Sequence, residues 1–168
     1  MKTESEASIN EYRKLTSNID NVSEKNILDK LSSEDQKNIE QARSERAETT
    51  ILIATNGNFK GELKVEHWWG QGLFYCYSKE YRITRSNGQS GGNKANLDFN
   101  FGSFPNGQSF ETRSGDDLHQ TGIWLPYQKG GWIGSPVGDR VMIFVKFIFD
   151  KSGSDPTGAN HIYLHRPS

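Results

Sequence analysis

The sequence lacks most of the features that identify a secreted or membrane-spanning protein. Cys76 is the only cysteine among 168 residues, so no disulfide can form within the chain. No segment approaches the roughly 20 apolar residues that a membrane-spanning helix needs, and residues 1–6 lack the apolar stretch of a signal peptide. We therefore expect synthesis in the cytoplasm without a signal peptide. A role outside the cell would need lysis or a dedicated export system.

The chain also has little excess of positive or negative charge. The formal net charge is −1, but residues 1–50 hold 8 Lys/Arg and 11 Asp/Glu, which gives −3, and residues 51–168 hold 12 and 10, which gives +2. Recognition of nucleic acid depends on clustered positive charge. The sequence therefore predicts that nucleic acid is not a partner.

Catalytic and metal-binding motifs are missing as well. Residues 88–92 read Gly-x-Ser-x-Gly but lie in a loop without the flanking strand–helix pattern that such a motif requires. The chain has no phosphate-binding glycine loop and no Cys/His pair, and we predict no catalytic residue and no cofactor. His161 and His165 would be about 13 Å apart on a strand, which is too far to share a metal ion. A hydrolytic enzyme stays an alternative only if His119, Asp116 and Asp117 converge in one cleft.

The first fifty residues contain no Gly, Pro or Cys and one aromatic residue, Tyr12. Apolar residues recur at helical intervals from Ile9 to Val22, and Ser33 and Gln36 have the spacing of a helix capping box. The apolar stripe is thin, so such helices must dock on the rest of the chain, pair with another copy or stay partly disordered. We predict an acidic helical leader over residues 1–48.

The hydrophobic period changes after Thr50. Short segments of alternating apolar and polar residues follow, separated by turn signals such as Asn56-Gly57-Asn58. Residues 141–149 are apolar except at Lys146, which is typical of a central strand. The sequence predicts a mainly β protein, with an antiparallel β-sandwich of about eight or nine strands over residues 50–168, preceded by the N-terminal helical segment.

All four tryptophans lie in this second part, beside glycines or in turn-rich stretches. Indole and phenol rings combine an apolar body with one polar group, which suits a half-hydrated interface such as a sugar, a lipid headgroup region or a protein groove. Burial at the ends of the sandwich is the competing interpretation. The candidate ligand-binding residues in the two aromatic stretches are Trp68, Trp69, Thr121, Gly122, Ile123, Trp124, Tyr127, Lys129 and Trp132.

The order of several short motifs resembles a known family. Residues 55–65 read TNGNFKGELKV, a Phe-rich strand at residues 99–104 meets Pro105-Asn106-Gly107-Gln108-Ser109, and residues 121–127 then read TGIWLPY. This order is similar to that of the C-terminal β-sandwich of thiol-activated, cholesterol-dependent cytolysins and of related small bacterial toxin-like domains. The resemblance covers roughly residues 50–135.

The resemblance implies a membrane-facing loop at residues 119–129. Thr121, Gly122 and Ile123 match the Thr-Gly-Leu core of the family's Trp-rich loop, and Lys129 stands where the family has Arg. Gln120 replaces the family's cysteine, and the Thr-Leu pair that contacts cholesterol is absent from the chain. The pore-forming domain is also absent. The resemblance thus implies surface binding, with neither cholesterol specificity nor lysis by this chain alone.

Together these features predict a non-catalytic, toxin-like recognition module that binds membrane lipid or a surface glycan through aromatic loops at the end of the sandwich. In that mechanism Lys129 pairs with a phosphate or an acidic sugar. The alternative is a protein–protein interaction module, in which residues 9–47 mediate homo-oligomer assembly or bind a partner toxin.

Overall fold

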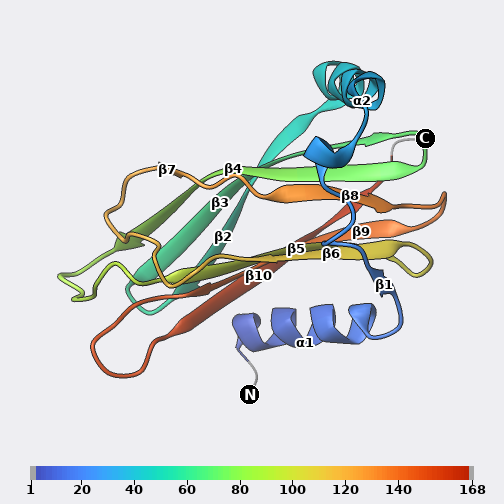
Figure 1. The fold of residues 1–168 in the computed structure, drawn as a ribbon. Coiled ribbons are helices and arrows are strands. Elements are labelled where there is room, and N and C mark those ends of the chain that lie inside the picture. Colours follow the sequence, from blue (N-terminus) through green and yellow to red (C-terminus); the bar gives the residue numbers. More distant parts are fainter. Residues whose placement is uncertain (1–2, 167–168) are drawn as a thin grey trace.

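The computed structural model describes residues 3–166, which form two β-sheets flanked by helices (Figure 1). Sheet A has the strand order β1 (Asp20–Asn21), β6 (Gln108–Arg113), β5 (Asn96–Phe104), β9 (Arg140–Ile148) and β10 (Thr157–His165). Sheet B has the order β2 (Glu48–Asn56), β3 (Phe59–Gly70), β4 (Leu73–Arg85) and β7 (Leu125–Pro126), and β8 (Gly130–Gly134) also pairs with β4.

The prediction of a mainly β fold with an N-terminal helix is confirmed. All strand pairs are antiparallel except that between β1 and β6, which is parallel. Residues 73–85 form one long strand, β4, which pairs with β3 along its length. The register of this pair shifts between Lys64 and Val65, which marks a β-bulge or a similar irregularity.

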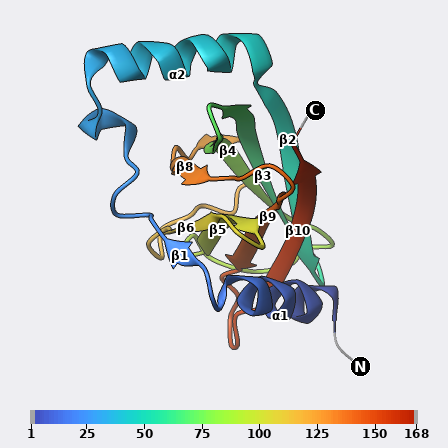
Figure 2. The ribbon, with the colours of Figure 1, turned by 90° about the vertical axis from the view of Figure 1, so that its right-hand side faces the viewer.

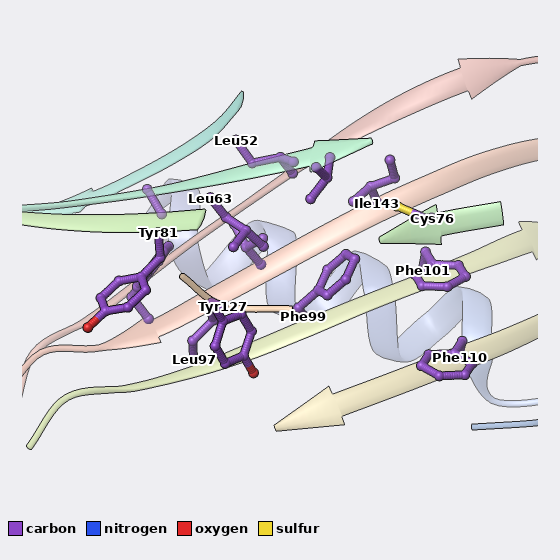
Figure 3. Close-up of a cluster of buried hydrophobic side chains, with 14 of the residues drawn as sticks. Leu52, Leu63, Cys76, Tyr81, Leu97, Phe99, Phe101, Phe110, Tyr127 and Ile143 are labelled. Carbon is purple, nitrogen blue, oxygen red and sulfur yellow. The ribbon is translucent and has the colours of Figure 1, made fainter. Parts of the chain in front are cut away.

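The core lies between the two sheets (Figure 3). Leu97, Phe99 and Phe101 alternate with polar residues along β5, and all three are fully buried, as expected for the inner face of a half-buried strand. The apolar segment 141–149 supplies most of β9, an inner strand of sheet A that lies between β5 and β10. Gly61 makes close packing of the sheets possible, because a Cβ at this position would lie 2.5 Å from the Phe147 ring.

Helix α1 (Glu4–Thr16) packs on the outer face of sheet A, against β9 and β10 (Figure 2). Thr3 and Glu6 form a capping box at its start, and Tyr12 stacks on Phe144 with ring centroids 4.8 Å apart. The helical pattern expected to reach Val22 ends earlier. After Thr16 the chain turns into β1, and Val22 is buried in the core instead.

The second helix, α2 (Ser33–Arg46), crosses sheet B after a short 3₁₀ turn at Leu28–Lys30 (Figure 2). The capping box expected from Ser33 and Gln36 is wrong by one residue. Ser32 is the N-cap and accepts a hydrogen bond from the Asp35 backbone N–H, whereas the Gln36 side chain donates to the Leu31 carbonyl. The leader therefore docks on both sheets of the sandwich, one helix on each.

Candidate binding surfaces on sheet B

The outer face of sheet B carries most of the predicted site residues. The strand period of two directs every second residue of β3 and β4 away from the core, so Trp68 lies opposite Tyr75 and Lys64 lies opposite Glu80. Helix α2 covers the end of this face that contains Trp68, and the other end is open. The face thus divides into a covered and an uncovered region.

A groove of about 670 Å³ lies under α2, between the helix, the turn before it and sheet B. We call it the α2 groove. The N-terminal leader forms one wall of this groove, and two hydrogen bonds hold the leader against the sandwich. The Asn26 side chain donates to the Trp132 carbonyl at 2.7 Å, and the Val22 N–H donates to the Ser109 carbonyl at 2.9 Å. Its volume is within the range of small-molecule binding sites.

Aromatic rings form the floor beside this groove. Trp68 stacks between neighbours on β4, with ring centroids 5.2 Å from Tyr75 and 5.6 Å from Tyr77, and Trp132 of β8 contacts Tyr75. Trp68 is 3 % exposed, yet its indole N–H has no hydrogen-bond partner among residues 3–166, and neither does the Tyr77 hydroxyl. Burial raises the pKa of Tyr77, so its hydroxyl stays protonated and able to donate.

Charged side chains surround the groove and are partly paired with one another. Glu66 accepts from the Arg43 guanidinium at 2.6 Å and lies 3.6 Å from the Lys79 ammonium, and Arg43 also reaches Glu40. These pairs connect α2 to both β3 and β4. Lys129, predicted from sequence as a contact for an anionic group, is exposed at the opposite rim.

The uncovered region of the same face contains Trp124. Lys64 Nζ lies 4.7 Å and Arg82 Cζ lies 4.5 Å from the centre of the indole ring, at cation–π distances. Ile123 beside it is 62 % exposed, and Ile51 and Ile53 of β2 are also exposed. We call this group of isoleucines, Trp124 and the two cations the outer patch.

A second cavity, of about 560 Å³, opens near Trp69 and the end of β10. Its lining includes His67 and His165, but His67 is buried and its Nε2 is 2.9 Å from Thr50 Oγ1. Burial lowers the pKa of His67, which favours the neutral ring. Trp69 turns inward, packs against the core and contacts Ser135 through its indole N–H.

The nine predicted site residues therefore do not form one exposed surface. Trp68, Tyr127 and Trp132 are buried, so the expectation of partly hydrated rings is wrong for them, and for these residues the competing interpretation, burial, holds. Burial also raises the pKa of Tyr127 to about 12. Residues 121–124 lie on the uncovered region, and Trp68, Lys129 and Trp132 lie in or beside the α2 groove.

Gln120, which replaces the cysteine of the cytolysin motif, has a structural role. It is 1 % exposed, and its side-chain amide donates to the carbonyls of Gly92 and Asp150 and accepts from the Asp150 N–H. It thereby joins three loops behind residues 121–124. An amide makes these three hydrogen bonds simultaneously, whereas a thiol is a weak donor and acceptor.

Two polar groupings contain side chains that are capable of nucleophilic or acid–base chemistry. His119, Asp116 and Asp117 are exposed on one turn and line neither cavity. Ser103, Ser135 and Asp139 do meet, with Ser103 Oγ 2.9 Å from both partners, but all three are buried and Asp139 also accepts from the Asn106 backbone. The second grouping fixes the adjoining loops rather than facing a cleft.

Comparison of the chain with protein-family models, with curated proteins and with solved structures gives no match in any of the three. Among residues 3–166 no three His, Cys, Asp or Glu side chains are grouped so that they could hold a metal ion. Neither helix of this described part is long and apolar enough to cross a bilayer.

Sequence reasoning missed Arg43, Tyr77 and Lys79 of the α2 groove, and Tyr75 of the aromatic floor beside it. A signal for the tyrosines was present, because Tyr75 and Tyr77 flank the buried Cys76 at strand spacing and so lie on the opposite face from it. Arg43 has no comparable signal. Its position depends on where α2 crosses the sheet.

Proposed function

We propose that this protein is a non-catalytic recognition module that binds a membrane surface through the outer patch. The observation that carries the proposal is the 62 % exposure of Ile123 beside Trp124, with Lys64 and Arg82 over the indole ring. Exposed apolar side chains, an indole ring and adjacent cations match the successive depths of a bilayer interface, from acyl chains to headgroups to phosphates.

The placement of these groups on one face supports the proposal. Ile51 is the register partner of Lys64, and Ile53 is that of Glu62, so the isoleucines of β2 lie in the same region as Trp124. Gly122 has a positive φ of 75°, and its N–H donates to the Ile83 carbonyl, which fixes the loop against β4. A loop held in this way exposes Ile123 without further ordering upon binding.

Charge supports a modest preference for anionic lipid. Lys60, Lys64 and Arg82 are opposed by only two carboxylates on this region, Glu62 and Glu80, and both carboxylates are already paired with these cations. The local excess is one positive charge, which is worth about 1 kcal/mol near an anionic membrane. Lipid contact through the isoleucines and Trp124 would supply the larger share.

Vesicle co-sedimentation tests this proposal. Wild-type protein should bind phosphatidylcholine vesicles and bind better when phosphatidylserine is added. Ile123→Ser should weaken binding about tenfold, since it removes an apolar side chain worth roughly 1–2 kcal/mol on insertion, and Trp124→Ala should weaken it comparably. Binding to neither kind of vesicle would refute the proposal.

Val137→Ser is the matched control, because Val137 is 87 % exposed in the loop after β8. That loop begins where Ser135 bonds to Gly72, beyond one end of β4, whereas Gly122 bonds to Ile83 near the other end. Its substitution should leave vesicle binding unchanged. An equal loss in Ile123→Ser and Val137→Ser would mean that non-specific hydrophobicity, and not the outer patch, drives binding.

Assembly through residues 9–47, the second function expected from sequence, has less support. Ile9, Tyr12 and Leu15, which would form an apolar assembly surface on α1, pack against sheet A of the same chain. Ile39 and Ala42 of α2 pack on the aromatic cluster of sheet B. A partner would meet mainly the polar sides of both helices.

A further inference from the structure

The α2 groove has features of a second binding site that the outer patch does not share. It combines unpartnered buried donors, charged groups of both signs and apolar walls within one volume of about 670 Å³. The outer patch lies beyond α2 on the uncovered region of sheet B. A ligand in the α2 groove would therefore bind independently of membrane contact through the outer patch.

The donors define what a ligand must offer. Trp68 and Tyr77 both line the groove, and the Trp68 indole N–H and the Tyr77 hydroxyl are buried with no hydrogen-bond partner among residues 3–166. Tyr75 and Tyr77 stack beside the Trp68 ring, and neither of them accepts a hydrogen bond from its N–H. An indole N–H can only donate. The ligand must therefore bring an acceptor oxygen to this floor.

The charges around the groove argue against a strongly anionic ligand. The carboxylates in its wall belong to Asp29, Glu40, Glu66 and Glu111. The cations belong to Arg43, Lys79, Arg113 and Lys129. The two sets are equal in number, so a phosphate or sulfate would meet as many repelling groups as attracting ones. A hydroxyl group, which both donates and accepts, can bond to either set.

Four apolar side chains contribute to the remaining walls. Ile27, Leu28 and Ile39 come from the leader, and Phe110 comes from β6. Such walls suit the C–H faces of a sugar ring, while the hydroxyls at its rim reach the polar groups. Pockets of this kind typically combine mostly apolar walls with a few fixed polar groups that set orientation.

We propose that the α2 groove binds a short, uncharged oligosaccharide. A sugar oxygen accepts hydrogen bonds from Trp68 Nε1 and the Tyr77 hydroxyl, and sugar hydroxyls donate to Glu66 and Glu40 at the α2 side. Helix α2 forms one wall of the site. The hydrogen bond from Asn26 to the Trp132 carbonyl fixes the segment before α2 against the aromatic floor.

Tyr77→Phe gives the sharpest test, because the full-length variant loses only the unpartnered hydroxyl. Removal of a buried donor that lacks a partner should leave the thermal unfolding midpoint unchanged or raise it. The same change should weaken oligosaccharide binding about tenfold, as expected for a hydrogen bond lost from a buried site. Trp68→Phe, which keeps an aromatic ring but removes the N–H, should weaken binding to a similar extent.

The binding measurement uses an array of immobilised neutral oligosaccharides and their sialylated counterparts. Calorimetric titration with the soluble form of the best-bound neutral oligosaccharide then gives the affinity of each variant. Wild-type protein should bind neutral members. Absence of binding across the array, or binding confined to sialylated members, would overturn the proposal, as would equal affinity of wild type, Tyr77→Phe and Trp68→Phe.

Two matched controls distinguish the loss of contacts in the α2 groove from the general effects of Trp→Phe and Tyr→Phe substitutions. Trp69→Phe removes an indole N–H that contacts Ser135 outside the groove, and Tyr163→Phe removes a hydroxyl that donates to Glu11 at 2.8 Å. Both should retain oligosaccharide binding, and Tyr163→Phe should lower the unfolding midpoint. Vesicle binding should be unaffected by Tyr77→Phe, and oligosaccharide binding by Ile123→Ser, so failure of either proposal leaves the other testable.

Discussion

The two helices of the leader are nearly equal in length, with 13 residues in α1 and 14 in α2, but they dock in different ways. Helix α1 buries Ser8 and Tyr12 against sheet A. It is joined to β6 and β10 by hydrogen bonds in which Tyr12 donates to Glu111, Ser5 and Glu11 accept from Ala159 and Tyr163, and Ser8 pairs with His161. Helix α2 buries no residue completely and leaves a groove beneath it.

The two interfaces differ in how completely side chains fill the space between helix and sheet. Under α1, β9 presents Met142 and Phe144, which fill the space between helix and sheet. Under α2, the sheet presents aromatic rings with unsatisfied polar groups, and the helix is held by the packing of Ile39 and Ala42 on these rings and by the ion pair of Arg43 with Glu66. A filled interface stabilises the fold, whereas an incompletely filled one leaves room for a ligand at some cost in stability.

Among the substitutions that test this comparison, Tyr12→Ala should cause the largest loss in free energy of unfolding. It removes the stack on Phe144 and the 2.9 Å hydrogen bond to Glu111, and the expected loss in free energy of unfolding is about 3–4 kcal/mol. Urea unfolding followed by intrinsic fluorescence would measure it. A loss no larger than that from Ile39→Ala, its half-buried counterpart on α2, would show that the two helices are docked equally well.

Gly131→Ala should come next, because it disturbs the segment that joins the helices. A Cβ at Gly131 would lie 2.4 Å from the Phe110 ring and 2.5 Å from the Asn26 carbonyl oxygen, so the leader backbone must shift. We expect a loss of about 2 kcal/mol and faster amide exchange over residues 22–27. Gly115→Ala is the control, since the nearest atom to its Cβ is 3.6 Å away; equal losses would contradict this account.

Arg43→Ala should have a smaller effect, confined to α2. Arg43 is partly exposed and pairs with Glu66 and Glu40, so the expected loss is below about 1 kcal/mol. Amide exchange should quicken in α2 and stay unchanged in α1. Lys37→Ala, on an exposed position of the same helix, should not alter exchange. Equal protection of α2 in both variants would show that the ion pair does not hold the helix.

The smallest effect is expected from pH, and it should act on α1. Burial lowers the pKa of His161, with Arg140 acting in the same direction and Glu11 in the opposite one, while Ser8 Oγ lies 2.9 Å from its Nδ1. The folded state therefore favours the neutral ring. This contribution is complete above the ordinary value of about 6.5 and is lost as pH falls below it.

Because burial also lowers the pKa of His67, the wild type should lose stability on acidification through both rings. His161→Gln should show a shallower loss between neutral pH and pH of about 5, above the range where most carboxylates titrate. Urea unfolding across this range would measure both slopes. Identical slopes in the two proteins would show that His161 does not contribute.

The β part of the fold could be predicted in outline because hydrophobic alternation is a local signal. The alternation of Leu97, Phe99 and Phe101 with polar residues indicates the inner face of β5, and the apolar run at 141–149 indicates the buried strand β9. The leader was harder. Its apolar spacing continues smoothly to Val22, and only the pairing of β1 with β6 makes the chain leave the helix after Thr16.

The candidate site could be predicted only in part, because exposure is a property of the assembled chain. Trp68 and Trp124 have similar sequence surroundings, each beside Gly or in a turn-rich stretch. One is covered by α2 and the other is not, and that depends on a helix roughly thirty residues earlier than Trp68 in the sequence. Ile123 could be predicted because it adjoins a turn glycine and belongs to no alternating pattern.

The pairing of β1 with β6 also bears on how the edge of sheet A is covered. An open strand at the margin of a sheet can recruit the same strand from a neighbouring molecule. Here β1 pairs with Gln108 and Ser109 on the free side of β6, and the side chains of Asn56 and Asn160 bridge β2 and β10 at the other edge. We therefore expect that deleting residues 1–48 promotes self-association by uncovering this edge.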